Sequence, residues 1–159
     1  MNGRAPYIGV IGAGEPDRTT EDTAESVGRL LAERGAVVIC GGLGGVMEAA
    51  CRGARSAGGV TVGILPGTER RHGNAYLDIA LPTGIGEMRN ALIVRASDAL
   101  IAVAGEFGTL SEIAFAIKTG VPVVGIDTWD LSKRGRADGS ILRAASPGEA
   151  VDRALRELS

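Results

Sequence analysis

The chain is poor in aromatic residues and in the residue types that usually hold metal ions. Aromatic residues make up 3% of the 159 positions, and there is one histidine, His72. A surface that stacks nucleic-acid bases on aromatic rings is therefore disfavoured. The two cysteines, Cys40 and Cys51, have neither CxxC nor zinc-site spacing. We expect no bound metal, and two small buried thiols in a reducing cytosol.

The chain also lacks an excess of charge of one sign and a long apolar run. Seventeen basic and nineteen acidic residues give a net charge of −2, and no basic stripe is present, which argues against a nucleic-acid partner. No apolar run approaches the roughly 20 residues of a membrane-spanning helix. Residues 1–6 do not resemble a signal peptide. We therefore expect a cytoplasmic protein with no nucleic-acid and no membrane partner.

Glycine, in contrast, is abundant, with 25 residues in a chain that is 45% apolar. Apolar runs that suit buried strands alternate along the chain with segments of helical periodicity. The length predicts a single domain over residues 1–159. Repeated strand–helix units with short connections predict an α/β fold, with a parallel sheet of about six to seven strands and helices on both faces.

The boundaries of the expected elements follow from the apolar runs and from the positions of glycine and proline. The expected strands cover residues 7–11, 36–40, 61–65, 77–81, 99–103, 121–126 and 141–145. The expected helices cover residues 23–34, 46–56, 86–97, 110–119 and 147–158. Loops are expected at residues 12–22 and 68–76, and a mobile loop at residues 127–140.

Two glycine-containing turns each follow an expected buried strand and precede an expected helix. Such a turn places backbone N–H groups at the carboxyl edge of a parallel sheet, where phosphate can bind. One turn of this kind is explained equally well as a tight connection without a ligand. Two turns, which we expect side by side, favour a small phosphorylated ligand. Their glycines are Gly41, Gly42, Gly44 and Gly45 in the first turn, and Gly105 and Gly108 in the second.

Glu112 has two interpretations, which do not exclude each other. The stretch from Thr109 to Glu112 fits a capping box, in which a Glu at the third helical position bonds the N-cap backbone. Alternatively, Glu112 lies in the first helical turn, beside whatever the preceding turn binds. A capped carboxylate at the edge of a site would be held rigidly for use.

Arg89 is a candidate because a cation in the first turn of a helix opposes the helix dipole. A surface salt bridge with Glu87 is one explanation. The alternative is that its guanidinium binds an anionic ligand, with Asn90 beside it hydrogen-bonding a sugar or a base. His72 belongs to a loop that is either a surface loop without a role in binding or a lid over the ligand.

A dinucleotide site is disfavoured. Gly12 and Gly14 lie in the first loop, but no third glycine follows at the required spacing. The second expected strand ends at Cys40, where a site for NAD would carry an acidic residue for the ribose.

Three segments carry a resemblance to a known family. Residues 41–48, which include Met47, resemble the GGGxxGLMG turn of the LOG family, a group of Rossmann-like phosphoribohydrolases often mislabelled lysine decarboxylases. Residues 88–90 lie where that family has an Arg-Lys pair, and residues 105–112 resemble its PGGxGTxxE signature. The resemblance extends over nearly the whole chain to a short DprA/Smf-related subfamily, which is also similar to molybdenum cofactor carrier proteins.

The resemblance implies a Rossmann-like fold and hydrolysis of the N-glycosidic bond of a nucleoside 5′-monophosphate, with Arg89 and Glu112 as the catalytic pair. The alternative is a non-catalytic carrier of a phosphorylated pterin such as the molybdenum cofactor, held as cargo with no cofactor required. It also implies a homo-oligomer, a dimer or a tetramer. The expected ligand contacts are Gly12, Gly14, Gly41, Gly42, Gly44, Gly45, Met47, Asn90, Gly105, Glu106, Gly108 and Thr109.

The chain departs from the family pattern at three positions. Ala104 replaces the signature proline, Glu106 replaces a glycine and Asn90 replaces a lysine. The last two changes remove positive charge or add negative charge near the expected phosphate. A pyridoxal-dependent decarboxylase is not supported, because the only lysines, Lys118 and Lys133, are not near the expected site.

Overall fold

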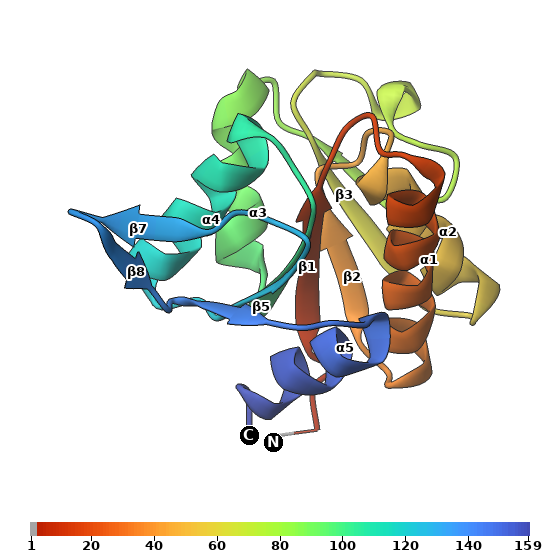
Figure 1. Ribbon diagram of the computed structural model, residues 1–159. Coiled ribbons are helices and arrows are strands. Elements are labelled where there is room, and N and C mark those ends of the chain that lie inside the picture. The colour runs from red at the N-terminus through yellow and green to blue at the C-terminus, as the bar shows by residue number, and fades with distance from the viewer. Residues whose placement is uncertain (1–2) are drawn as a thin grey trace.

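Seven parallel strands form the centre of the molecule. The computed structural model describes residues 3–159 and places them in the order β4-β3-β2-β1-β5-β6-β9 (Figure 1). This confirms the predicted α/β class and the parallel sheet. The strands are β1 (Tyr7–Gly12), β2 (Val37–Cys40), β3 (Thr61–Leu65), β4 (Ile79–Pro82), β5 (Ala99–Val103), β6 (Val123–Ile126) and β9 (Ile141–Arg143).

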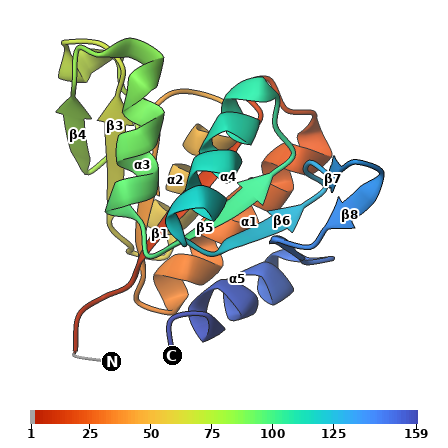
Figure 2. The ribbon, with the colours of Figure 1, turned by 90° about the vertical axis from the view of Figure 1, so that its left-hand side faces the viewer.

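Helices cover both faces of the sheet, as predicted (Figure 2). Apolar side chains of the strands pack on one face against α1 (Arg18–Glu33), α2 (Val46–Ser56) and α5 (Pro147–Arg156). On the other face they pack against α3 (Asn90–Ala96) and α4 (Phe107–Thr119). All five residues of β5 are buried, because a central strand of such a sheet has a helix layer on each side.

The direction of strand order reverses beside β1. From β1 the chain adds β2, β3 and β4 on one side, whereas β5, β6 and β9 lie on the other side. Helices that follow β1 and β5 therefore leave towards opposite faces and open a crevice at the carboxyl ends of these strands. The two glycine turns were expected side by side, but β1 separates β2 from β5, so the turns are not direct neighbours.

Three helices begin at different residues from those predicted. α1 begins at Arg18 rather than residue 23, because the carboxylate of Asp17 accepts a hydrogen bond from the Thr20 backbone N–H at 2.8 Å and caps the helix. α4 begins at Phe107 rather than residue 110. The segment Gly86–Arg89 is a 3₁₀ turn, and α3 begins only after it.

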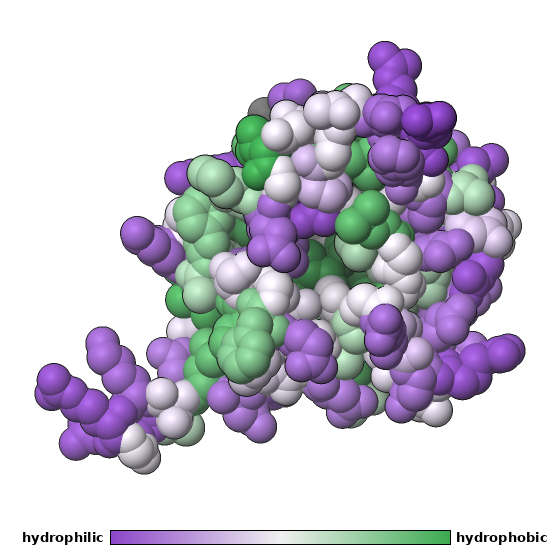
Figure 3. All heavy atoms as spheres, turned by 90° about the horizontal axis from the view of Figure 1, so that it is seen from above, coloured by the Kyte–Doolittle hydropathy of each residue, from purple (hydrophilic) through white to green (hydrophobic). Residues whose placement is uncertain are grey.

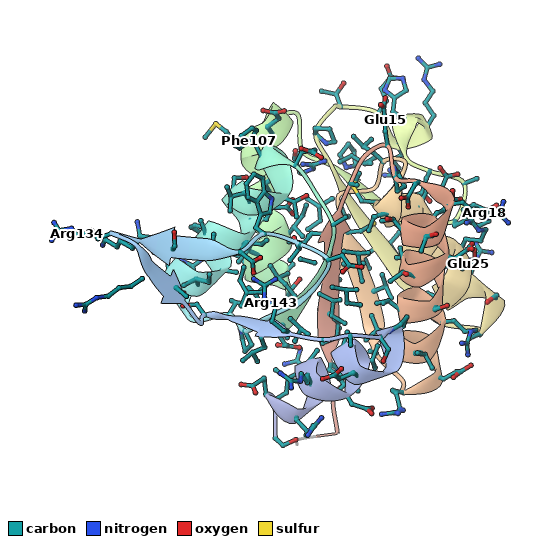
Figure 4. The ribbon with its side chains drawn as sticks, in the orientation of Figure 1. Glu15, Arg18, Glu25, Phe107, Arg134 and Arg143 are labelled. Carbon is teal, nitrogen blue, oxygen red and sulfur yellow. The ribbon has the colours of Figure 1, made fainter. Side chains whose placement is uncertain are left out.

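The segment predicted as a mobile loop, residues 127–140, contains a β-hairpin. Its strands, β7 (Leu131–Lys133) and β8 (Arg136–Asp138), pair only with each other in the described part of the chain. The hairpin projects from the body of the molecule, with Arg134 at its tip (Figure 4). At its base, Nη2 of Arg143 donates hydrogen bonds to the Trp129 carbonyl and to Asp130, each at 2.5 Å.

Candidate functional site

A cleft of about 440 Å³ opens at the carboxyl ends of β1, β2 and β5, and the strand order reverses between β1 and β5. Viewed from this edge, apolar side chains lie at the bottom of a central hollow, and both polar and apolar side chains form its rim (Figure 3). The residues lining the cleft are Val10, Ile11, Gly12, Gly14, Gly41, Leu43, Met47, Pro66, Glu87, Arg89, Asn90, Ile93, Glu106, Gly108, Thr109 and Glu112.

The cleft brings together most of the residues predicted for the site. Both members of the predicted catalytic pair line it, together with most of the predicted ligand contacts. Their part in binding stays a prediction. Gly42, Gly44, Gly45 and Gly105 do not line the cleft. His72, the only histidine, is exposed in the 3₁₀ turn Arg70–His72 and does not line it either.

Arg89 is buried and is held by the ends of two strands. Its Nε donates to the Ile64 carbonyl at 2.8 Å, and its Nη2 donates to the Gly41 carbonyl at 3.3 Å. Its Nη1 donates to Oδ1 of Asn90. These bonds use three of the five guanidinium N–H donors. Two donors remain on a cation that lines the cleft, and its position is fixed before any ligand arrives.

The predicted surface salt bridge does not explain Arg89. Glu87 is exposed and is not hydrogen-bonded to the guanidinium, whose partners are two backbone carbonyls and Asn90. Gly41 makes room for the guanidinium, because a Cβ at this position would lie 2.8 Å from Nη2 of Arg89. Part of the first glycine turn therefore serves to seat the arginine.

Two helix N-termini face the cleft without a side-chain cap. The N-cap residues Gly45 of α2 and Glu106 of α4 make no capping side-chain hydrogen bond. Met47 at the start of α2, and Gly108 at the start of α4, line the cleft. Helix N-termini present unpaired N–H groups and a partial positive charge, which favour an anion.

Glu112 is buried, with 8% of its surface exposed. Burial raises the pKa of its carboxyl from 4.5 to about 8, although the charge of Arg89 opposes the shift. Its Oε2 has no hydrogen-bond partner in residues 3–159. At neutral pH the free protein therefore holds Glu112 as a protonated carboxyl in the cleft, with one oxygen that lacks a hydrogen-bond partner.

The capping-box interpretation of Glu112 is wrong. Because α4 begins at Phe107, Glu112 lies in its second turn, too far along to reach the N-cap backbone. Thr109 is likewise inside the helix, rather than at its N-cap. The error came from placing the start of the helix after the glycine-containing turn, whereas Gly108 is part of the first helical turn.

Five of the eight glycines predicted for the site show two different situations. Gly42, Gly45 and Gly105 have positive φ, and a Cβ on each would overlap neighbouring atoms, so the backbone itself requires glycine there. A Cβ on Gly14 or Gly108 would meet no atom within 4 Å, and neither residue has a positive φ. The fold therefore does not explain these two glycines, which line the cleft.

Sequence reasoning missed the apolar floor and part of the wall of the cleft. The floor comes from Val10 and Ile11 of β1 and Ile93 of α3. In the sequence, a place in the core is enough to account for these apolar residues, so nothing marks them as lining a site. A clue was available in the strand order, since ligands in open α/β sheets bind where that order reverses.

No group of three or more His, Cys, Asp or Glu side chains in residues 3–159 is arranged to hold a metal ion. No described helix is both long enough and apolar enough to cross a membrane.

Comparison with known proteins gives close structural neighbours. A molybdenum cofactor binding protein from the phototrophic bacterium Rippkaea orientalis has 34% sequence identity and a TM-score of 0.89, covering 99% of this chain and 100% of the other. The molybdenum cofactor carrier protein of Chlamydomonas reinhardtii has 30% identity and a TM-score of 0.83, covering 98% and 99% of the two chains.

Two other matches are informative in different ways. An uncharacterized protein of Archaeoglobus fulgidus is 53% identical over 119 residues, which are 75% of this chain and 78% of the relative. DNA processing protein A of Helicobacter pylori has 18% identity and a TM-score of 0.70, covering 96% and 81% of the two chains, and shares the fold alone.

The family model of the SLOG cluster4 family matches residues 5–151. This match spans nearly the whole chain, and it includes both glycine turns, Arg89 and Glu112. It confirms the resemblance inferred from the sequence motifs. The chain therefore belongs to the SLOG cluster4 family.

Proposed function

We propose that this protein binds a phosphorylated pterin such as the molybdenum cofactor in the cleft and carries it without converting it. The observation that carries the proposal is one cleft that combines a fixed arginine, two uncapped helix N-termini and an unpartnered buried carboxyl. Support comes from the likeness to molybdenum cofactor binding and carrier proteins along the whole chain.

The phosphate of such a ligand has suitable partners in the cleft. The uncapped N-termini of α2 and α4 offer backbone N–H groups to the phosphate, and the two remaining donors of Arg89 are left for another acceptor of the ligand. Glu106 also lines the cleft and would repel a phosphate placed beside its carboxylate. The phosphate is therefore proposed to bind the backbone of the α4 N-terminus near Gly108, with the Glu106 side chain turned towards N–H or O–H groups of the ligand.

A variant of Gly108 tests this placement without disturbing the fold. A Cβ at Gly108 would meet no atom within 4 Å, and alanine favours the helix. Gly108→Ala is expected to keep or slightly raise the melting temperature, and to weaken binding of a phosphorylated pterin about tenfold or more, measured by calorimetry. Gly148→Ala, in the first turn of α5 and also free of contacts, is the matched control. Unchanged affinity in Gly108→Ala would contradict the placement.

Arg89 is expected to be needed for the same binding. Arg89→Met keeps the aliphatic stem and removes every donor, and we expect at least a hundredfold loss of affinity, because hydrogen bonds to charged groups are worth about 1.5–3 kcal/mol each. The melting temperature should be measured in parallel, since the guanidinium also bonds the carbonyls of Ile64 and Gly41. Tight binding by a folded Arg89→Met variant would refute the proposed site.

A second candidate function is hydrolysis of a nucleoside 5′-monophosphate, as in the LOG family. The observation that favours it is Glu112, whose pKa of about 8 lies near neutral pH in a cleft that also holds Arg89. In such a reaction, the ionised carboxylate would stabilise positive charge on the ribose as the bond to the base breaks. The test is release of free base from a panel of nucleoside 5′-monophosphates, which Glu112→Gln should abolish without unfolding the protein.

The proposed setting is the cytoplasm, with the chain assembled as a homo-oligomer. The buried thiols of Cys40 and Cys51 lie 3.5 Å apart without a disulfide, which suits a reducing compartment. Met88 and Phe107 are each more than three-quarters exposed, beside α3 and at the start of α4. Large apolar side chains left this open favour burial against a second copy.

A further inference from the structure

The buried part of the cleft holds two groups with opposite hydrogen-bonding needs. Arg89 has two guanidinium donors left over from its bonds to the protein. Glu112 has a buried oxygen, Oε2, that accepts no hydrogen bond from residues 3–159. The charge of Arg89 acts on Glu112, yet no hydrogen bond joins them. A ligand that fits here brings an acceptor for Arg89 and donors for Glu112.

The unpartnered Oε2 of Glu112 limits which ligands suit the cleft. A buried polar atom without a partner is costly, and a ligand that supplies the missing partner recovers that cost. A phosphate beside the ionised carboxylate would repel it and would supply no donor, whereas N–H or O–H groups of a ligand can bond both of its oxygens. The group that faces Glu112 therefore carries N–H or O–H donors, and the phosphate of the same ligand lies elsewhere in the cleft.

We infer that Glu112 and Arg89 together recognise the 2-amino-4-oxopyrimidine edge of a pterin, with its phosphorylated side chain directed to the N-terminus of α4. This edge presents an amino group, a ring N–H and a carbonyl in one row. The two donors face the carboxylate of Glu112, and the carbonyl accepts from Arg89. The assignment rests on the proposed pterin-binding function and makes Glu112 the residue that determines specificity.

The protonation state of Glu112 is consistent with this arrangement. Burial keeps the carboxyl protonated in the free protein at neutral pH, because its pKa is about 8. Two ligand N–H donors stabilise the ionised form, which accepts at both oxygens. The apolar floor from Ile11 and Ile93 suits the ring system behind that edge.

The inference is tested with two probes that differ by one group. Neopterin monophosphate carries the 2-amino group, and the corresponding lumazine monophosphate has a carbonyl oxygen in its place. In the lumazine, an acceptor faces the carboxyl of Glu112, where the pterin presents a donor. We expect the wild-type protein to bind the pterin at least about tenfold more tightly than the lumazine at pH 7.5, measured by fluorescence titration, and the preference to fall at lower pH, where Glu112 keeps its proton and can donate to the lumazine carbonyl.

Two variants test whether Glu112 causes the preference for the pterin over the lumazine. Glu112→Gln should lose most of the preference for pterin and keep its affinity for the lumazine, because an amide offers both a donor and an acceptor. Glu48→Gln is the matched control, since Glu48 lies in the first turn of α2 and does not line the cleft. This control should keep the full preference.

The possible failures are distinguishable. Equal binding of both phosphorylated probes by the wild-type protein overturns the recognition of the pterin edge and leaves the proposed carrier function standing. An undiminished preference in Glu112→Gln also overturns it, because another group would then read the edge. If neither probe binds to folded wild-type protein, the proposed function fails together with the inference.

Discussion

At the scale of single residues, the cleft holds the Arg89 guanidinium and the Glu112 carboxyl with no hydrogen bond between them, and the unpartnered carboxyl lowers the stability of the fold. Arg89 is fixed by two backbone carbonyls and Asn90 and keeps two donors, whereas Glu112 keeps a buried oxygen without a partner in residues 3–159. A fold selected for stability alone would place an apolar residue at position 112. An unsatisfied group of this kind is expected where a ligand completes the set of hydrogen bonds.

The cost of Glu112 depends on pH in a defined direction. Its pKa is raised from 4.5 to about 8 in the folded protein, so the folded state binds this proton more tightly than the unfolded chain does. The stability that the protonated form of Glu112 contributes is fully present below pH 4.5, and it is lost as the pH rises towards 8.

Glu112→Gln, which cannot titrate, should therefore gain stability relative to the wild type as the pH increases. The free energies of unfolding of the two proteins should diverge by up to about 4 kcal/mol between pH 4.5 and 9, in favour of the variant. Urea denaturation at several pH values measures this difference. A constant difference across that range would show that Glu112 has an ordinary pKa.

The sequence predicted which residues meet in the cleft better than it predicted why. It marks Arg89 as a cation at the start of a helix, whereas in the structure Arg89 lies in the 3₁₀ turn before α3 and lines the cleft. The bonds that hold it come from the ends of β2 and β3, far along the chain. The sequence places Glu112 near the site because it expects this residue in the first turn of the helix. The helix begins earlier, at Phe107, and a local capping pattern does not reveal that. Long-range contacts of this kind leave no local signal.

At the scale of elements, the close packing of α1 on α2 depends on two glycines. A Cβ on Gly28 would lie 2.7 Å from the carbonyl carbon of Ala50, and one on Gly53 would lie 2.8 Å from that of Glu25. The obstructing atoms are backbone, which cannot rotate away as a side chain can. These glycines bring the helices together, and α2 carries the glycine turn of the cleft at its start.

Gly28→Ala should accordingly destabilise the protein strongly. We expect a loss of about 3 kcal/mol or more in the free energy of unfolding, because the added methyl group forces the helices apart. Gly148→Ala in α5 is the matched control, which should be neutral or stabilising by up to about 1 kcal/mol. Equal thermal stability of the two variants would contradict the described packing.

Most elements could be predicted from apolar runs and end signals. The strand predicted at residues 121–126 is β6, at Val123–Ile126. The last helix begins at Pro147 as predicted, with Ser146 as its N-cap accepting from the Glu149 N–H. The hairpin at residues 131–138 could not be predicted, because its short strands are polar and mostly exposed, so no alternation of apolar residues marks them. Ala104 has a φ of 52°, which proline cannot adopt, so its replacement of the signature proline accompanies a different backbone.

At the scale of the whole molecule, apolar side chains remain uncovered beside the cleft. Met88 and Leu92 lie at or near α3, and Phe107 begins α4, where it packs on Trp129 with ring centroids 5.3 Å apart. Between the start of α3 and α4 lies a shallow groove of about 290 Å³, whose lining includes Phe115. A second copy of the chain is the proposed cover for this surface.

Light scattering after size-exclusion chromatography should therefore give a mass of two or four times 16.2 kDa. Met88→Lys should shift the mass towards the monomer, because it buries a charge in the contact. Val60→Lys, an exposed apolar residue just before β3, is the control that should leave the mass unchanged. A monomeric wild-type protein would refute the proposed assembly.

The most direct test of the carrier function is a single titration of the wild-type protein with a phosphorylated pterin, followed by recovery of the ligand. We predict saturation at one ligand per chain with a submicromolar dissociation constant, and recovery of the ligand chemically unchanged after prolonged incubation. Weak binding, together with release of free base from a nucleoside 5′-monophosphate under the same conditions, would contradict the carrier account and establish the hydrolase in its place.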